Sequence, residues 1–160
     1  MVRFAAHIIT VSDGVHHGTR IDESGDRLEV VLVGAGFEPV ERAVAPDEQQ
    51  VISEMIRRAA SMAHLVVTTG GTGFGPRDVT PEATAAVVER PAPGLVQLML
   101  ARGIASTPMA ALSRPVAGAI GNSLVINLPG SPRGAVENLE AVLGILAHAL
   151  TLLSGDTEHT

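Results

Sequence analysis

The sequence of 160 residues contains no cysteine, lysine, tryptophan or tyrosine, and aromatic residues make up only 2% of it. Without cysteine there can be no disulfide and no thiolate metal ligand, and a reducing cytoplasm is the expected location. Without lysine, a phosphate-binding loop of the type GxxxxGK[ST] is excluded. Because aromatic residues are so few, the hydrophobic core must be built from valine, leucine, isoleucine and alanine.

Charge and hydropathy exclude further classes. The net charge is −6 and the eleven basic residues, all arginines, are dispersed, so we expect no nucleic-acid groove. The longest apolar run, Ala141–Leu153, contains His148 and is shorter than the roughly 20 residues that span a bilayer. Residues 1–13 resemble a first strand more than a signal peptide, so no membrane partner is expected. Length and a hydrophobic fraction of 46% predict one domain over residues 1–160, with a frayed tail at 154–160.

The stretch Leu65–Thr84 combines three local patterns. Leu65–Thr69 is short, apolar and β-branched, which is typical of a buried strand. Gly70–Arg77 holds four glycines and a proline, which predicts a loop. Thr80 and Pro81 then suit the N-cap and first position of a helix. Successive backbone N–H groups in such a glycine loop can bind an anion, although a tight structural turn is an equally good interpretation.

Strands alternate with helices along the rest of the chain. Further strands are predicted at Phe4–Val11, Phe37–Val44, Val116–Ile120 and Leu124–Leu128. Helices are predicted at Asp26–Ala35, after Asp47, at Glu82–Arg90, Gly94–Arg102, and from Pro132 to about Leu153, with Ser24, Asp47 and Ser131 as N-caps. The last helix has one apolar stripe, formed by Leu139, Val142, Leu143, Leu146 and Leu150. The alternation predicts an α/β fold, a three-layer α/β/α sandwich with a mostly parallel sheet.

Ligands of parallel sheets bind at the carboxyl ends of the strands, where polar residues gather in this sequence. Asp13, Asp22 and Asp47 follow the first two predicted strands. A hard cation such as Mg²⁺ prefers carboxylate oxygens together with substrate phosphates. The alternative is that these carboxylates are solvated and that Asp47 only caps a helix.

Other polar groups also allow two interpretations. Asp78 can pair with Arg77, orient a phosphate or accept a proton. The pair Ser113-Arg114 suits bidentate phosphate binding, or it is an exposed surface pair. Ser131 offers a helix N-terminus to an anion, or it is a plain cap. The adjacent His16 and His17 lack a third histidine at helical spacing, so we expect them to be solvated rather than metal-bound.

Five motifs, in order, resemble one family. Matches to TVSDG…GxxxDxSG fall at Ser12, Asp13, Gly18, Asp22, Ser24 and Gly25. Further matches are VAPDE at 44–48, TTGGTG…RDVTPEAT at 68–84, LSR…AG at 112–118 and LVINLPGSP at 124–132. Over about residues 7–150 the chain resembles the molybdopterin adenylyltransferases, which include the G domains of gephyrin-type proteins.

The resemblance implies a function and a set of roles. Members transfer AMP from Mg-ATP to the terminal phosphate of molybdopterin, release pyrophosphate, assemble as homotrimers and pass their product to a molybdate-insertion protein. The implied catalytic residues are Asp13, Asp47 and Asp78, and Asp13 and Asp47 would hold Mg²⁺. The implied molybdopterin-binding residues are Gly70, Gly71, Thr72, Gly73, Ser113 and Arg114. The implied nucleotide-binding residues are Ser12, Asp22, Ser24, Asn127, Pro129, Gly130 and Ser131.

Two other functions remain open at this point. One is a non-catalytic molybdopterin-binding paralogue or scaffold, and the other is a general nucleotide-binding α/β domain with an unrelated partner. The joint presence of Asp13, Asp47 and Asp78 favours the enzyme.

Overall fold

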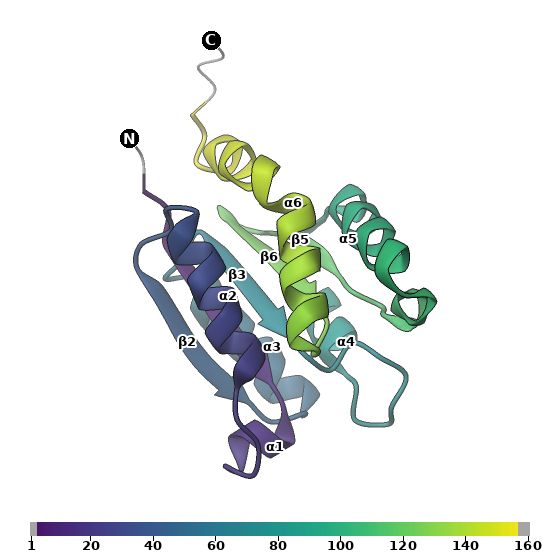
Figure 1. Cartoon of the computed structure of the whole chain (residues 1–160). Helices are drawn as coiled ribbons and strands as arrows, with labels where there is room; N and C mark the ends of the chain where they lie inside the picture. The colour runs from purple at the N-terminus through teal and green to yellow at the C-terminus, as the bar shows by residue number, and fades with distance from the viewer. Residues whose placement is uncertain (1–2, 157–160) are drawn as a thin grey trace.

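A single six-stranded sheet organises the computed structural model, which describes residues 3–156 (Figure 1). Its strand order is β2-β1-β3-β6-β5-β4. The first four of these are parallel, and their bounds are β2 Val40–Ala45, β1 Ala6–Val11, β3 Leu65–Thr69 and β6 Ser123–Leu128. The other two, β5 Ala117–Ile120 and β4 Arg90–Pro91, pair in antiparallel fashion with their neighbours. The prediction of a mostly parallel sheet is confirmed.

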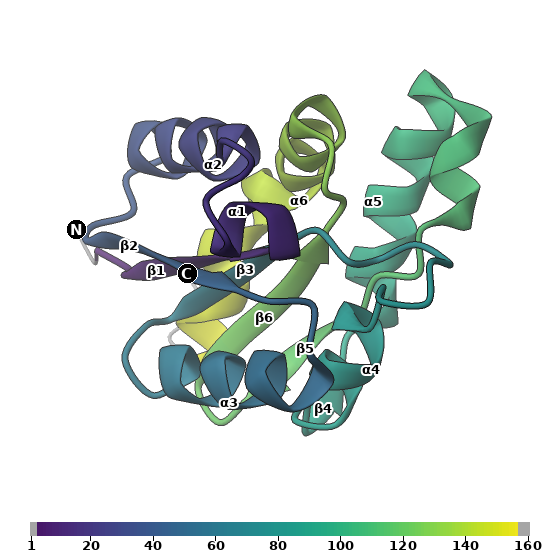
Figure 2. The ribbon, with the colours of Figure 1, turned by 90° about the horizontal axis from the view of Figure 1, so that it is seen from below.

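Helices cover both faces of the sheet, which confirms the predicted three layers (Figure 2). One face carries α2 Glu23–Gly34, α5 Pro93–Ser106 and α6 Pro132–Leu153, and the other carries α3 Gln49–Ala60 and α4 Thr80–Ala85. A short helix, α1 Asp13–His16, follows β1, and a 3₁₀-helix, η1 Pro108–Leu112, follows α5. Residues 157–160 of the predicted tail lie outside the described residues.

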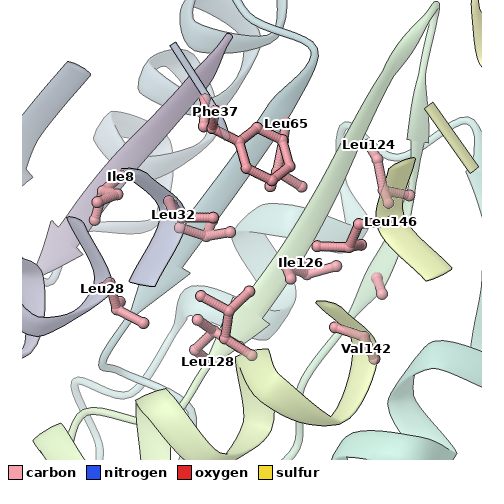
Figure 3. Close-up of a cluster of buried hydrophobic side chains, with 14 of the residues drawn as sticks. Ile8, Leu28, Leu32, Phe37, Leu65, Leu124, Ile126, Leu128, Val142 and Leu146 are labelled. Atoms are coloured by element: carbon pink, nitrogen blue, oxygen red, sulfur yellow. The ribbon is translucent and has the colours of Figure 1, made fainter. Parts of the chain in front are cut away.

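The two faces of the sheet enclose two separate cores, because successive strand residues point to opposite sides. On one face, Ile8, Leu65 and Ile126 pack against Leu32 of α2 and Leu146 of α6 (Figure 3). On the other face, the alternate strand residues pack against α3 and α4. The buried residues of this core include Ile9, Val66 and Val125 of the strands and Ile52, Ile56 and Ala83 of the helices.

Helix α6 is long and apolar enough to cross a membrane by length and composition alone. Its 22 residues exceed the apolar run that the sequence indicated. The fold accounts for part of this composition, since the predicted stripe lies in the core while Ile145 and Leu152 are exposed. Leu139, Val142, Leu146 and Leu150 are buried there, and Leu143 packs against them in part.

Three of the four predicted N-caps are wrong. The observed N-caps of α2, α3 and α4 are Asp22, Glu48 and Val79, in place of Ser24, Asp47 and Thr80. Each displaced side chain has a partner elsewhere in the chain. The Ser24 hydroxyl donates to the Gly130 carbonyl (2.7 Å), the Asp47 carboxylate accepts from the Asp13 N–H (2.9 Å), and the Thr80 hydroxyl donates to the Gly70 carbonyl (2.9 Å). The fourth, Ser131, caps α6 as predicted, because its oxygen accepts from the Gly134 N–H (3.2 Å).

Some boundaries also differ from the prediction. Helix α4 ends at Ala85, and Arg90 begins the short strand β4, where the pattern predicted a helix through Arg90. Strand β2 begins at Val40 rather than Phe37, because Phe37 turns into the core before the chain joins the sheet.

Replacing Leu146 with alanine should lower the free energy of unfolding by about 2–5 kcal/mol, since this side chain is fully buried and its removal leaves a cavity. The matched control is Ile145→Ala in the preceding position of the same helix, where the side chain is 46% exposed; its cost should stay below about 1 kcal/mol. Urea unfolding of both variants tests the packing, and equal losses would contradict it.

Candidate active site

The carboxyl ends of the central strands lie at the same level. Thr10 of β1 is opposite Thr69 of β3, and Thr69 is opposite Leu128 of β6. The segments that follow these strands therefore leave the sheet side by side. The Gly70 N–H donates to the Leu128 carbonyl (3.1 Å), which continues the pairing one residue beyond the strands.

The glycine loop requires glycine at its first two positions. Gly70 has a φ of +102°, and a Cβ there would lie 2.3 Å from the carbonyl oxygen of Val11. Gly71 has a φ of +69°, and a Cβ there would lie 2.4 Å from Oγ1 of Thr80. Both the backbone conformation and the available space exclude a side chain at these positions. The loop is thus a tight turn, as one of the two interpretations of its sequence predicted, and anion binding stays a prediction.

A cavity of about 950 Å³ opens at this edge of the sheet. It brings together nine of the predicted site residues: Ser12, Asp22, Ser24, Asp47, Gly70, Gly71, Asp78, Gly130 and Ser131. Sequence patterns did not single out Thr10 and Thr69 at the ends of β1 and β3, nor Arg20 and Ile21, which also line it. The available signal for the two threonines was their place in the motifs TVSDG and TTGGTG, each at the end of a predicted strand.

A smaller cavity of about 340 Å³ lies on the other side of the glycine loop. It contains the remaining predicted wall residues Thr72, Gly73, Ser113 and Pro129, with apolar side chains from Met99, Leu100, Met109 and Leu112. The Ser113 hydroxyl donates to the Thr72 hydroxyl (3.1 Å). Ser131 lines both cavities, so they adjoin at the N-terminus of α6.

Asp13 and Asp47 hold each other through the backbone. The N–H of each donates to the carboxylate of the other, at 2.9 Å in both directions. Arg77 donates from Nε and Nη2 to both oxygens of Asp13 (2.6 and 3.2 Å). The hydrogen bond from Arg77 and the Asp47 N–H hold the pKa of Asp13 at about 2. Burial, followed by the negative charges of Asp13 and Asp78, raises the pKa of Asp47; a nearby cation would offset this effect.

Asp47 and Asp78 each have a carboxylate oxygen that is free to bind a ligand, as do Glu23 and Asp26 at the start of α2, whose second oxygens accept no hydrogen bond among the described residues. Within residues 3–156, Oδ1 of Asp47 and Oδ1 of Asp78 accept no hydrogen bond, and both residues line the larger cavity. Both oxygens of Asp13 are already occupied, and Asp13 does not line the cavity. No cluster of three or more histidine, aspartate or glutamate side chains that could hold a metal occurs in the described part. A metal ion here would need phosphate or water for its other ligands.

Arg114 lies against the glycine loop rather than on a cavity wall. Its Nε donates to the Gly73 carbonyl (2.9 Å), its Nη2 to the Asp78 carbonyl (3.0 Å) and its Nη1 to the Glu82 carboxylate (2.6 Å). The guanidinium also lies over the ring of Phe74, 5.3 Å from its centroid. Arg114 therefore stabilises the conformation of the glycine loop.

Asn127 also serves the interior. It is fully buried and lines neither cavity. Its amide nitrogen donates to the hydroxyls of Thr68 and Thr84 (2.9 Å each), and its oxygen accepts from the Val116 N–H (3.0 Å). The side chain joins β6 to β3, α4 and the segment before β5, so its contribution to the site is through the position of these elements.

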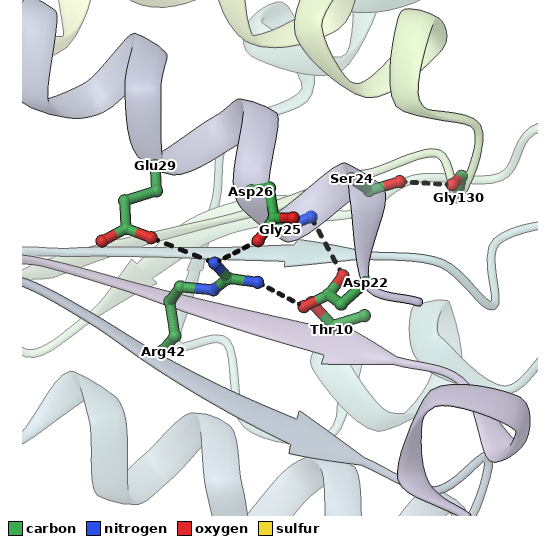
Figure 4. A network of polar contacts seen from close by, with 8 residues as sticks. All are labelled: Thr10, Asp22, Ser24, Gly25, Asp26, Glu29, Arg42 and Gly130. Atoms are coloured by element: carbon green, nitrogen blue, oxygen red, sulfur yellow. Dashed lines mark hydrogen bonds and ion pairs between the residues drawn. The ribbon is translucent and has the colours of Figure 1, made fainter. Parts of the chain in front are cut away.

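A network around Arg42 of β2 fixes the beginning of α2 (Figure 4). The guanidinium pairs with the carboxylates of Asp22 (2.8 Å), Asp26 (2.7 Å) and Glu29 (3.0 Å). Asp22 further accepts from the Thr10 hydroxyl (2.8 Å) and from the N–H of Gly25 (3.0 Å). Both oxygens of Asp22 are therefore used within the protein. This cavity-wall residue holds the helix end in place.

With the geometry established, comparison with known proteins identifies the class. Residues 7–148 match the family model described as "Probable molybdopterin binding domain". The chain belongs to this family, which confirms the resemblance seen in the sequence.

Three relatives illustrate the similarity. The chain is 37% identical over 153 residues to a protein named molybdopterin adenylyltransferase from Helicobacter pylori, covering 93% of this chain and 87% of that one. It is similar to the structure of the molybdopterin biosynthesis enzyme MoaB from Thermus thermophilus, with a TM-score of 0.88, 48% identity and coverage of 95% and 97%. The Mog protein from Mycobacterium ulcerans gives a TM-score of 0.90, 35% identity and coverage of 97% and 99%.

Other relatives are much longer. The match to the cinnamon protein from Drosophila melanogaster, at 37% identity, covers 93% of this chain but only 25% of that protein. The chain spans 22% and 48% of two further curated relatives. It therefore corresponds to one part of these proteins.

Gly70→Ala should destabilise the domain by more than the roughly 1 kcal/mol expected for a positive φ alone, because the added Cβ meets the Val11 carbonyl. Gly18→Ala is the matched control, since Gly18 also has a positive φ (+78°) but has nothing within 4 Å of the added atom. Thermal unfolding of the two variants tests the close approach, and a Gly70 variant no less stable than the Gly18 variant would argue against it.

Proposed function

We propose that this chain is a molybdopterin adenylyltransferase of molybdenum cofactor biosynthesis, which transfers AMP from ATP to the terminal phosphate of molybdopterin. The observation that carries the proposal is the pair of cavities that adjoin at Ser131 on either side of the glycine loop. A reaction between two substrates needs two sites that share a boundary. Relatives that bear this enzyme's name, and of which the chain covers up to 87%, support the proposal.

The two cavities suit different substrates. The larger one has backbone N–H groups at the glycine turn and free oxygens on Asp47 and Asp78, which suit a nucleotide triphosphate and its cation. The smaller one has a methionine-rich apolar wall and the hydroxyls of Thr72 and Ser113, which suit a ring system with a polar edge. We therefore assign ATP to the larger cavity and molybdopterin to the smaller one.

The reaction is a nucleotidyl transfer. An oxygen of the terminal phosphate of molybdopterin attacks the α-phosphorus of ATP, the bond from that phosphorus to the β-phosphate oxygen breaks, and pyrophosphate leaves with the bonding electrons. Both reactants are anionic, so catalysis consists mainly of holding them close and neutralising their charge. The glycine loop from Gly71 onward and the N-terminus of α6 at Ser131 would supply backbone N–H donors where the cavities meet.

Mg²⁺ bound here would neutralise phosphate charge. Asp47 fits this ion best, with Asp78 as its partner, because each has an oxygen free of hydrogen bonds among the described residues and each carboxylate lies against the glycine loop. Both carboxylate oxygens of Asp13 accept hydrogen bonds, from Arg77 and from the Asp47 N–H. We therefore assign Asp13 to positioning Asp47. It would become a metal ligand only after Arg77 moves away.

Several expectations stay predictions: the homotrimer, the downstream molybdate-insertion protein, and the cytoplasmic location. The alternative function is a molybdopterin-binding scaffold without catalysis. Pyrophosphate release in the presence of molybdopterin and Mg-ATP separates the two, because a scaffold would bind molybdopterin and release none.

Asp47→Asn should lower the rate of AMP transfer by at least about 100-fold, because the neutral amide cannot hold the cation that neutralises the phosphates. Molybdopterin affinity should stay within about threefold, since molybdopterin is assigned to the other cavity. Glu48→Gln is the control: it removes the neighbouring carboxylate, which makes no cap hydrogen bond. Pyrophosphate release and equilibrium binding provide the two measurements. Loss of molybdopterin binding in a folded Asp47 variant would mean that the two subsites are not independent.

The loss of kcat/KM at low pH should follow the protonation of the Asp47 carboxylate. Its carboxylate must be ionised to bind a cation, so kcat/KM is retained above its pKa and lost as the pH falls through that value. Since the pKa of Asp47 is raised, the decline should begin at a higher pH than for an ordinary aspartate. Arg77→Met removes a positive charge that lowers this pKa, and should move the decline further toward high pH. Rates between about pH 4 and pH 8 test this, with Arg57→Met on α3 as the control; an unshifted decline would exclude Asp47 as its source.

A further inference from the structure

The larger cavity has an unusual balance of charge for a nucleotide site. Its wall carries five carboxylates, from Asp22, Glu23, Asp26, Asp47 and Asp78, and a single cation among the described residues, Arg20. A nucleotide triphosphate is strongly anionic, and charge-assisted hydrogen bonds from a guanidinium are among the strongest that a phosphate can receive. Arg20 is therefore the one side chain on this wall that can approach the phosphates with a favourable charge.

The side chain of Arg20 is available for such a contact. Among residues 3–156 it has no ion pair and no hydrogen bond, and it is exposed. The other arginines around the site, Arg42, Arg77 and Arg114, are bound to carboxylates of the protein itself. The guanidinium of Arg20 differs from these three because, among the described residues, no carboxylate is paired with it.

The backbone beneath this side chain is fixed at both ends. The N–H groups of Thr19 and Arg20 both donate to the Gly14 carbonyl, at 2.9 and 3.1 Å. On the other side, Asp22 is held by the network around Arg42 (Figure 4). Arg20 and Ile21 therefore form a short bridge between two anchored points. Their position over the cavity is set by the fold, while their side chains remain free.

Ile21 adds an apolar surface to the same rim. It is 84% exposed, more than any other large hydrophobic side chain in the described part of the chain, and it lines the cavity. An exposed isoleucine costs free energy unless a ligand covers it. A nucleotide offers such a cover in the flat face of its base.

We propose that Arg20 and Ile21 form a nucleotide-recognising rim, in which the guanidinium contacts the phosphates and the isoleucine packs on the base. This inference rests on the assignment of ATP to the larger cavity. Both residues fall at variable positions of the GxxxDxSG pattern, between Gly18 and Asp22, so the resemblance to the family gave them no role.

The test separates the two contacts by shortening the ligand. Mg-ATP and adenosine each displace a fluorescent ATP analogue from the wild type and from Arg20→Gln, Ile21→Ser and the control Arg57→Gln. Arg20→Gln should weaken Mg-ATP about tenfold and leave adenosine unchanged, because adenosine has no phosphate. Ile21→Ser should weaken both ligands by a similar factor, about threefold to tenfold. Arg57→Gln, on the exposed side of α3, should change neither.

The possible failures are distinguishable. If the wild type binds Mg-ATP and releases pyrophosphate while Arg20→Gln binds Mg-ATP within twofold of it, the rim is wrong and the proposed function stands. Equal weakening of adenosine and Mg-ATP by Arg20→Gln would also overturn the phosphate contact. If the wild type neither binds Mg-ATP nor releases pyrophosphate with molybdopterin, the proposed function is wrong and the rim with it.

Discussion

The close approach of Gly70 to the carbonyl of Val11 is the constraint on which the site depends. Strands β1, β3 and β6 are in register, so the segments that follow them leave the sheet at the same level. A chain that turns there meets the end of its neighbour, and a Cβ would lie 2.3 Å from that carbonyl oxygen. Glycine allows the turn, and the turn places the Gly70 carbonyl where Thr80 can bind it. The glycine loop, the start of α4 and the two cavity walls all follow from this one contact.

Most arginines near the larger cavity form ion pairs with carboxylates of the protein itself. Arg77 pairs with Asp13, Arg114 with Glu82, and Arg42 with three carboxylates at the start of α2. These pairs hold loops in place, and they leave the larger cavity with an excess of negative charge. A cation is then favoured next to Asp47, whose pKa is raised first by burial and then by the negative charges of Asp13 and Asp78. An acidic cavity that binds a metal-nucleotide complex needs fewer fixed cations than one that binds the bare nucleotide, so the proposed phosphate site is compatible with a chain that has no lysine.

Sequence patterns predicted the parts of the fold that depend on local periodicity. Strand β3 was predicted at its observed bounds because all five of its residues are buried, and burial selects the apolar and β-branched residues that the pattern shows. The stripe of α6 was predicted because its buried positions, and so its apolar residues, recur at helical spacing. The caps at Ser24, Asp47 and Thr80 were mispredicted because their partners are 106, 34 and 10 residues away in sequence. Because these contacts also join residues far apart in sequence, local patterns did not predict the division into two cavities or the binding of Arg114 to the glycine loop and Glu82. A local pattern shows that a polar side chain is present, but the topology decides what it binds.

The order of the strands also bears on where the two proposed substrates would meet. Ser12 and Asp47 follow β1 and β2, so they lie on one side of β3, whereas Ser113 precedes β5 and lies beyond β6 on the other side. Groups contributed from these two sides cannot form a single compact pocket, because the loop after β3 and the start of α6 stand between them. That boundary carries Gly70, on the wall of the larger cavity, and Ser131, which lines both. In the proposed reaction, a group transferred between ligands on opposite sides would cross this boundary, which the fixed turn at Gly70 and the capped helix at Ser131 hold in place.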